Sequence, residues 1–441
     1  MKLIAPFAIL AVIGTAVTLT TGCPGDDCTR TATCPSSSGG GGAGAAGGAG
    51  SVGGSGTGTG TGGTAPSCGN GTVDAGELCF TEPAVTYETG GEDARDMVLV
   101  DCDADGDLDV VVAHFNEALL TTMRNTGAAF NELIESDTQG YPLMALDLVD
   151  LGGSFEIAGL SSSTSNRVVW FTSAPATPCG WAAAPATQPT VGVPVGLGYG
   201  DLDGNANPDT VRVVDNDTDT YGAYTVFPNH DPTVIDTEVT WGADPTALLV
   251  GDFVGSPLDD LVVAHSDQTT LTLLENQSGI LSSTPIDVPG GGVADHPVAM
   301  AAGDLNADGL LDIVTANVVN GSIAVLRNLG AGGFSAQSPE PKVEEASSNP
   351  QAIALGDIDG DGDLDIATAN GNGGGTGTVS IFLNDGTGTM TLASTSGFTV
   401  GQNPSAVQLA DLNGDGATDI ITTNAHVESG TSSISVLVAA P

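Results

Sequence analysis

The chain has 441 residues, of which 54 are acidic and 8 are basic, so its formal net charge is −46 at pH 7 although only 14% of its residues are charged. Nucleic acid is excluded as a partner, because the basic residues of the C-terminal part are too few and too scattered to form a basic surface: Arg95, Arg124, Arg167, Arg212, Arg327 and Lys342. Cations are the expected partners of such a chain.

The first 22 residues have the composition of an export signal. A single Lys2 precedes an apolar run that ends near Leu19, and small residues follow up to Cys23. The run is also nearly long enough for an uncleaved membrane anchor. The segment TTGC that ends at Cys23 resembles the lipobox of bacterial lipoproteins, with Thr20 where Leu is usual. This resemblance implies a signal peptide at 1–22, lipidation of Cys23, and anchoring to a bacterial membrane, at the outer membrane, the cell surface or in the periplasm.

Residues 23–67 are dominated by Gly, Ser, Ala and Thr and are expected to form a disordered tether. The next segment, 68–80, contains CGNGTVDAGELC and resembles short Cys-bracketed segments of secreted and surface bacterial proteins. With Cys23 set aside, six cysteines remain, an even number that indicates disulfides in an exported chain. Neighbouring cysteines are expected to pair, which leaves the last two either paired or both free: Cys28 with Cys34, Cys68 with Cys79, and then Cys102 and Cys179.

Residues 81–441 repeat an acidic segment at a nearly constant interval. The copies are DCDADGDLD from Asp101, DLDGNANPD from Asp201, DFVGSPLDD from Asp252, DLNADGLLD from Asp304, DIDGDGDLD from Asp357 and DLNGDGATD from Asp411. From Asp201 onward they are 51, 52, 53 and 54 residues apart, and 143–160 supply a worn copy, which makes seven units. Short apolar runs separated by Gly or polar turns follow each copy, as in strands.

A unit of about 50 residues with four short strands and no helical periodicity is typical of a propeller blade, whereas the repeats of a parallel β-helix are usually shorter. The sequence therefore predicts an all-β, seven-bladed β-propeller over 81–441. The last unit ends at SISVLVAAP without an outer strand, and LCFTEPAVTYETG (78–90) has strand character without a unit of its own. We expect this N-terminal strand to complete the last blade and close the ring, because closure removes two sheet edges.

The acidic segments place oxygen donors at positions 1, 3, 5 and 9, a backbone carbonyl at position 7 and, in four copies, a Gly at position 6 for a sharp turn. Oxygen donors in this number are typical of Ca²⁺ sites, whereas Mg²⁺ prefers a strict octahedron. Two carboxylates ~4 Å apart near a surface repel by roughly 4 kcal/mol, which a bound cation offsets. A solvated turn residue is the common alternative for a single Asp, but five copies in phase favour about four to five structural Ca²⁺ sites.

The loops, the period and the LxN-G turns resemble FG-GAP/VCBS repeats, as in the β-propeller of integrin α-subunits, over residues 80–441. The resemblance implies structural calcium in hairpin loops on one face and ligand binding on the opposite face. It implies these side-chain ligands: Asp101, Asp103, Asp105 and Asp109; Asp201, Asp203, Asn205 and Asp209; Asp304, Asn306, Asp308 and Asp312; Asp357, Asp359, Asp361 and Asp365; and Asp411, Asn413, Asp415 and Asp419.

Two units depart from this pattern and are not expected to hold calcium. The Asp252 loop has Val254 and Ser256 at positions 3 and 5. The second unit keeps only remnants, namely Asp147, Asp150 and Glu156. The Asp201 loop also has Ala206 in place of the Gly, which weakens the expectation for that site.

The sequence contains no recognisable catalytic motif. His114 and His265 lie thirteen residues after the first Asp of their loops, where other units have Asn, so a structural role is expected. The other histidines, His230, His296 and His426, lie in turns without a partner pattern. A sugar-binding surface could be built from three tryptophans, but packing is the favoured role: Trp170, Trp181 and Trp241.

These observations favour a calcium-stabilised, extracytoplasmic and monomeric β-propeller that is not an enzyme. We expect it to act as a surface binding or adhesion module for an unknown protein or carbohydrate ligand, and to contact the membrane only through its N-terminal lipid anchor. The alternatives are a carbohydrate-active propeller hydrolase or lyase, and a purely structural surface component.

Overall fold

The computed structural model describes residues 78–127, 129–150, 155–161, 166–174, 177–183, 193–205, 209–215, 222–227, 235–237, 244–266, 270–277, 281–287, 296–337, 341, 343, 349–371, 375–393, 397–425 and 430–439. All of them belong to one compact unit of the chain. The expected signal peptide, Cys23, the tether and the cysteines Cys28, Cys34 and Cys68 lie outside these residues. None of the described residues forms a helix that could cross a membrane.

Every described element is a β-strand, and the strands form seven antiparallel sheets. Sheet 1 contains β2 (Ala94–Val100), β3 (Asp109–His114), β4 (Leu119–Asn125) and β5 (Phe130–Asp137); sheet 2 contains β6 (Ala145–Asp150), β7 (Phe155–Ser161), β8 (Arg167–Ser173) and β9 (Trp181–Ala183). Sheet 3 contains β10 (Val193–Gly200), β11 (Asp209–Asp215), β12 (Gly222–Phe227) and β13 (Ile235–Thr237); sheet 4 contains β14 (Pro245–Gly251), β15 (Asp260–His265), β16 (Thr270–Asn276) and β17 (Leu281–Asp287).

Two of the remaining three sheets contain a strand outside the simple four-strand order. Sheet 5 is regular and contains β18 (Pro297–Gly303), β19 (Asp312–Asn317), β20 (Ser322–Asn328) and β21 (Phe334–Ala336). Sheet 6 contains β22 (Asn349–Gly356), β23 (Asp365–Gly371), β24 (Thr376–Asn384) and β25 (Met390–Leu392), with β26 (Phe398–Gln402) also paired to β24. Sheet 7 contains β27 (Pro404–Ala410), β28 (Asp419–Asn424), β29 (Ser433–Leu437) and β1 (Val85–Glu88).

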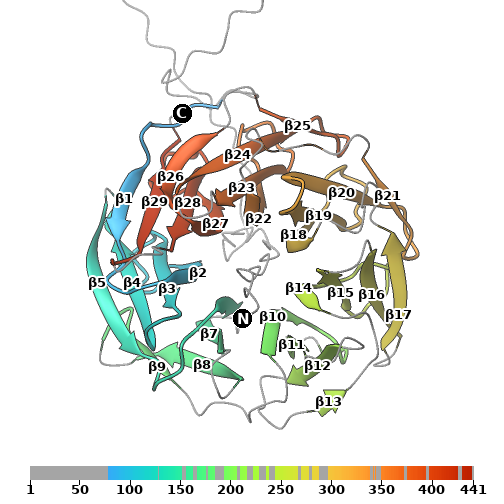
Figure 1. Ribbon diagram of the computed structural model, residues 1–441, viewed down its shortest axis with the longest axis horizontal. Helices are drawn as coiled ribbons and strands as arrows, with labels where there is room; N and C mark the ends of the chain where they lie inside the picture. Colours follow the sequence, from blue (N-terminus) through green and yellow to red (C-terminus); the bar gives the residue numbers. More distant parts are fainter. Residues whose placement is uncertain are drawn as a thin grey trace, which may run out of the picture. The chain divides into compact units, whose positions relative to one another are not determined.

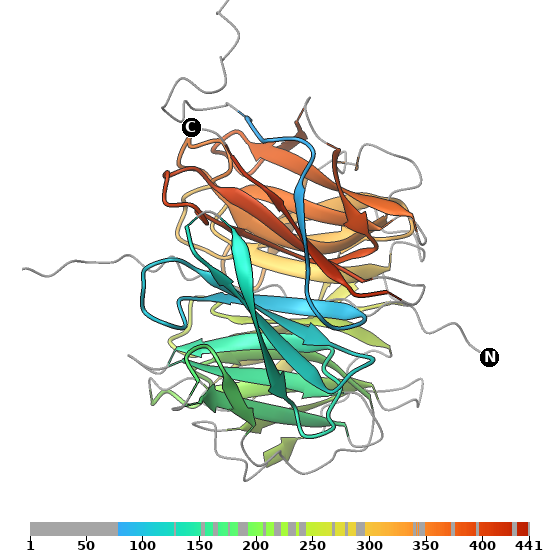
Figure 2. The same cartoon turned by 90° about the vertical axis from the view of Figure 1, so that its left-hand side faces the viewer.

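The seven sheets stand around a common centre, with the first strand of each sheet nearest to it (Figure 1). Each first strand contacts the first strand of the next sheet, and β27 contacts β2. Figure 2 shows the same sheets from the side, with β1 beside the C-terminal strands. The strand β1 pairs with β29 from Val85 opposite Val436 to Glu88 opposite Ser433, so residues from both ends of the described chain share sheet 7. The fold is thus an all-β propeller.

Burial explains why the repeated sequence forms these strands. The second strands β3, β15, β19, β23 and β28 are buried along their whole length, and apolar clusters lie between neighbouring sheets. Strands covered on both faces have continuous apolar sequences instead of alternating ones. Prolines such as Pro245 and Pro297 begin first strands and are followed by a register shift, a position that needs no donor N–H.

Candidate metal-binding loops

The predicted acidic segments link the first and second strands of their sheets. We call each of them an acidic loop and number its positions from its first Asp, so that position 9 begins the second strand. Position 6 is a glycine with positive φ in several loops, for example Gly106 at 98° and Gly362 at 94°. Position 4 is also left-handed, and there two loops place an alanine, Ala104 at 61° and Ala307 at 57°. The sequence pattern predicted the first of these tight points and missed the second.

The carboxylate at position 1 folds the loop around itself. In sheet 1, Asp101 accepts the N–H groups of Asp105 and Gly106, both at 3.1 Å. In sheet 5, Asp304 accepts the equivalent N–H groups of Asp308 at 3.1 Å and Gly309 at 2.8 Å. The side chains at positions 1, 3 and 5 are thereby gathered at the tip of the hairpin.

In each of three loops, three acidic side chains lie close enough together to share a cation. Ligand atoms within 4.8 Å of one another are found in the loops of sheets 1, 3 and 6, in these sets: Asp101, Asp103 and Asp109; Asp201, Asp203 and Asp209; and Asp357, Asp359 and Asp361. The loops of sheets 5 and 7 have an amide at position 3, Asn306 and Asn413, whose oxygens accept the N–H of Asp308 at 3.0 Å and of Asp415 at 2.9 Å.

The loop of sheet 6 fits a divalent cation. Oδ1 of Asp357 is buried and has no hydrogen-bond partner among the described residues. Asp359 is only 3% exposed, and its pKa is raised by burial and then by the negative charges of Asp361 and Asp357. A buried, unsatisfied carboxylate oxygen among like charges is costly. A cation with oxygen ligands would remove both penalties.

The aspartate at position 9 has a role that the metal-ligand pattern did not reveal. Asp312 is fully buried and accepts the N–H of Leu305 at 3.1 Å on one oxygen and the N–H of Asn328 at 2.6 Å on the other. The same two bonds recur at the position-9 aspartates of other sheets: Asp109, Asp260 and Asp365. This side chain therefore joins its own loop to the end of the third strand.

The loop of sheet 4 shows that this join does not require metal ligands. It has Val254 and Ser256 at positions 3 and 5, yet Asp260 is fully buried and accepts the N–H groups of Phe253 at 2.9 Å and Asn276 at 2.8 Å. Burial raises the pKa of position-9 carboxyls, to about 7 for Asp365 and about 6 for Asp419, while the bonds from backbone N–H groups lower it.

Asparagines at the ends of third strands connect neighbouring sheets. Nδ2 of Asn328 in sheet 5 donates to the carbonyl of Phe253, which is position 2 of the loop in sheet 4, at 2.9 Å. The same bond, which we call the asparagine clip, reaches back to the preceding sheet from Asn125 to Leu412, from Asn276 to Leu202 and from Asn384 to Leu305. The recurring LxN-G turn was the sequence signal for it.

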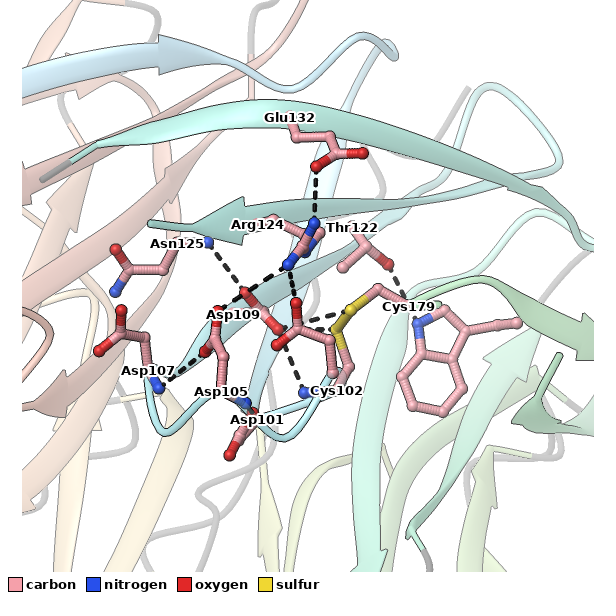
Figure 3. Close-up of a disulfide and its surroundings, with 12 residues drawn as sticks. Asp101, Cys102, Asp105, Asp107, Asp109, Thr122, Arg124, Asn125, Glu132 and Cys179 are labelled. Carbon is pink, nitrogen blue, oxygen red and sulfur yellow. Dashed lines mark hydrogen bonds and ion pairs between the residues drawn. A yellow bond between two sulfur atoms is a disulfide. The ribbon is translucent and has the colours of Figure 1, made fainter. Parts of the chain in front are cut away.

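The junction of sheets 1 and 2 is built differently. Cys102, at position 2 of the first loop, forms a disulfide with Cys179, in the turn between β8 and β9. Both sulfur atoms contact Oδ2 of Asp109, at 2.7 and 3.6 Å (Figure 3). This pairing resolves the alternative that the sequence left open. Cys79 is also disulfide-bonded, and Cys68, its expected partner, lies outside the described residues.

The second unit brings its acidic residues into a different environment. Asp147 on β6 is 7% exposed, and its pKa is raised well above normal by burial and then by the charge of Asp96. Asp96 is 3% exposed, accepts the N–H of Leu146 across the junction at 2.8 Å, and has its pKa raised to about 8 by burial. Glu156 lies on β7. Asp147 and Glu156 therefore lie on strands and not in an acidic loop.

The expected structural roles of His114, His265, Trp170 and Trp181 are confirmed. His114 and His265 are fully buried, and each bonds a threonine hydroxyl of the next strand at 2.9 Å. Burial lowers the pKa of His114 to about 4. Trp170 and Trp181 are 5% and 6% exposed, so neither offers a surface for stacking. His296 directly precedes β18, and the remaining three, His230, His426 and Trp241, lie outside the described residues.

Comparisons with known structures support the fold. The chain is similar to BBS1N, solved in complex with ARL6DN in crystals soaked with lead or with mercury, with a TM-score of 0.56 and 13% identity over 82% of this chain and 97% of that chain. It is also similar to Raptor from Chaetomium thermophilum, with a TM-score of 0.53 and 9% identity, over 82% of this chain and 29% of that one.

The sequence comparisons identify the repeat. A search of curated proteins gives no match. The family model described as FG-GAP-like repeat matches residues 252–315, 304–368 and 367–422, which span the acidic loops of sheets 4 to 7. Residues 252–422 of this β-propeller chain therefore match FG-GAP-like repeats.

Proposed function

We propose that the chain is a calcium-stabilised, seven-bladed β-propeller that acts outside the cytoplasm as a non-catalytic binding module. The seven sheets would be its blades, and the pairing of β1 with β29 would close the ring. Closure by an N-terminal strand gives the last blade its fourth strand, so that β29 does not remain an unpaired edge strand.

The observation that carries the calcium proposal is the buried, unsatisfied Oδ1 of Asp357 beside two further carboxylates. Asp357, Asp359 and Asp361 would hold the ion in sheet 6, with a backbone carbonyl as a further ligand. When bound, Ca²⁺ supplies the positive charge that these groups lack. The corresponding ligand groups in sheets 3, 5 and 7 are Asp201, Asp203 and Asn205; Asp304, Asn306 and Asp308; and Asp411, Asn413 and Asp415.

Thermal unfolding in millimolar Ca²⁺, millimolar Mg²⁺ and excess EDTA tests this proposal. Extracellular calcium modules commonly bind at ~10⁻⁴ to 10⁻³ M, and several such sites filled in the folded state together raise the melting temperature by mass action. We expect Tm to fall substantially in EDTA and to recover with Ca²⁺ more than with Mg²⁺. An unchanged Tm in EDTA would contradict structural calcium.

A binding role is supported by the fold. BBS1N, whose fold is similar to that of this chain, was solved in complex with ARL6DN. His114, His265, Trp170 and Trp181 are engaged in packing, so they provide no argument for a catalytic site. The ligand would be a protein or a carbohydrate that contacts the face opposite the acidic loops.

Export and lipidation extend the proposal and rest on the N-terminal sequence alone. The module would stand on the tether 23–67, anchored by lipid on Cys23 at the outer membrane, the cell surface or in the periplasm. Mass spectrometry of the mature N-terminus tests this part. We expect a lipid-modified Cys23, whereas an intact Met1 or an unmodified residue beyond Cys23 would contradict it.

A further inference from the structure

Two acidic loops have the same five aspartates but differ in the residue that lies over them. The loop of sheet 1 reads DCDADGDLD and the loop of sheet 6 reads DIDGDGDLD. The residue that precedes the clip asparagine in the third strand is Arg124 in sheet 1 and Leu383 in sheet 6, and both strands have the same register against the second strand. The two loops therefore form a natural comparison of one ligand set with and without a nearby cation.

The guanidinium of Arg124 lies among the carboxylates of its own loop (Figure 3). It forms a close ion pair with Asp103 at position 3, and it lies 3.8 Å from Asp105 at position 5. The side chains of Arg124 and Asp103 are only 24% and 10% exposed, so water screens this pair incompletely. Guanidinium is permanently charged and presents several donors in a plane that suits carboxylates.

A second acid holds Arg124 in this position. Glu132 lies opposite Arg124 on β5 and accepts a hydrogen bond from Nη1 at 2.7 Å. Sheet 5 shows what happens without this acid, because Arg327 occupies the same strand position but lies opposite Ser335. Nη2 of Arg327 donates instead to the hydroxyl of Thr389 in sheet 6 at 3.0 Å. An arginine at this position is thus turned toward its loop in sheet 1 and toward the next sheet in sheet 5.

We propose that Arg124 is the resident cation of the first acidic loop, so that this loop keeps its shape without calcium while the loop of sheet 6 binds it. Only the statement that the loop of sheet 6 binds calcium rests on the proposed function. Ligand positions 3 and 5 are already paired to a fixed positive charge in sheet 1. A divalent cation would have to displace the guanidinium from both carboxylates, or bind beside it against charge repulsion. In sheet 6 Leu383 brings no charge, and Oδ1 of Asp357 has no hydrogen-bond partner among the described residues. Oδ1 of Asp103 in sheet 1 has none either, but its carboxylate is already paired with Arg124.

Calcium stoichiometry tests the proposal. Bound Ca²⁺ per chain is counted by equilibrium dialysis at saturating Ca²⁺ for the wild type and Arg124→Leu, with Arg327→Leu as the matched control. We expect Arg124→Leu to bind one more ion than the wild type and Arg327→Leu to bind the same number. If the wild type binds calcium, an equal count for the wild type and Arg124→Leu would overturn the proposal.

A second pair of variants keeps the proposal testable if Arg124→Leu does not fold. Asp103→Asn and Asp359→Asn change the same loop position in sheets 1 and 6. The first should leave the calcium count unchanged and the second should lower it by one, whereas the loss of one ion in both would overturn the proposal.

Thermal unfolding in EDTA separates this inference from the calcium proposal. Without calcium, Arg124→Leu should lower Tm by several degrees relative to Arg327→Leu, because it leaves two loop carboxylates without a counter-charge. If the wild type binds no calcium at all, the proposed function is wrong and this comparison alone decides the role of Arg124. Equal Tm values for the two variants in EDTA would then refute it.

Discussion

Replacement of Asp260 by Ala isolates the mechanical role of position 9 from metal binding. Asp260 accepts three N–H groups, from Phe253 at 2.9 Å, Val254 at 3.2 Å and Asn276 at 2.8 Å. Each buried donor left unsatisfied costs about 1–3 kcal/mol, and part of that loss is offset by removing a buried carboxyl and by water entering the space. We therefore expect the free energy of unfolding to fall by about 3–5 kcal/mol, which at roughly 2 °C per kcal/mol lowers Tm by about 6–10 °C.

The loop of sheet 4 lacks ligand side chains at positions 3 and 5, so this loss should be equal in EDTA and in millimolar Ca²⁺. Differential scanning calorimetry under both conditions measures this loss of stability. Glu275→Ala, which changes the residue before Asn276 on β16, is the control and should change stability by less than about 0.5 kcal/mol. Asp312→Ala, in a loop that keeps its ligands, should lose more in Ca²⁺ than in EDTA. A loss for Asp260→Ala that appears only in Ca²⁺ would refute the reasoning.

Three further predictions concern the junctions. Asn328→Ala removes the bonds from Nδ2 to the carbonyls of Phe253 and Leu311, at 2.9 and 3.1 Å, and should lower the unfolding free energy by about 2–3 kcal/mol in urea titrations; no change would show that water replaces the clip. Cys179→Ser opens a disulfide that spans 77 residues and should lower stability by about 4 kcal/mol, as Cys102→Ser should; a further loss in the double variant would contradict this. Asp147→Asn should stabilise the protein above about pH 5. Burial raises the pKa of Asp147 and of Asp96, the latter to about 8, so the folded state keeps protons that the unfolded state releases, and wild-type stability falls as the pH rises from about 4 to about 8. Urea midpoints between pH 5 and 8.5 should therefore diverge in favour of the variant, and parallel curves would refute this assignment.

The propeller fold could be predicted because its signal is periodic. The interval between acidic loops, the prolines at first strands and the continuous apolar runs each repeat, and they correspond to strands in the structure. A repeat that recurs in phase supports one supersecondary unit much more strongly than any single motif does. The expected site residues at positions 1, 3 and 5 could be located for the same reason.

The remaining features depend on pairs of residues that the repeat does not bring together in sequence. The asparagine clip joins Asn384 to Leu305, 79 residues apart, and its donor looks like an ordinary turn residue. The role of position 9 was hidden because a buried hydrogen-bond acceptor and a metal ligand require the same side chain. Arg124 could be placed over its loop only once the register opposite Glu132 was known. The spacing of the sequence shows which residues repeat. Interactions that occur in only one unit can be predicted only when the pairing register of the strands is known.

The junction of sheets 1 and 2 shows how the structure compensates for a degenerate repeat. Sheet 2 has lost its acidic loop, and its third strand β8 contains no asparagine that could reach back to position 2 of the first loop. Position 2 of that loop is Cys102, and its side chain is bonded covalently to Cys179 of sheet 2. At this junction a disulfide fixes position 2 of the loop to the following sheet. At the junctions that have an asparagine clip, a hydrogen bond does so. Arg124 forms an ion pair with Asp103 of the same loop. Sheet 1, beside the degenerate unit, therefore combines a covalent junction with an internal counter-charge. Neither device requires a bound ion, and both lie in the sheet that adjoins the degenerate unit.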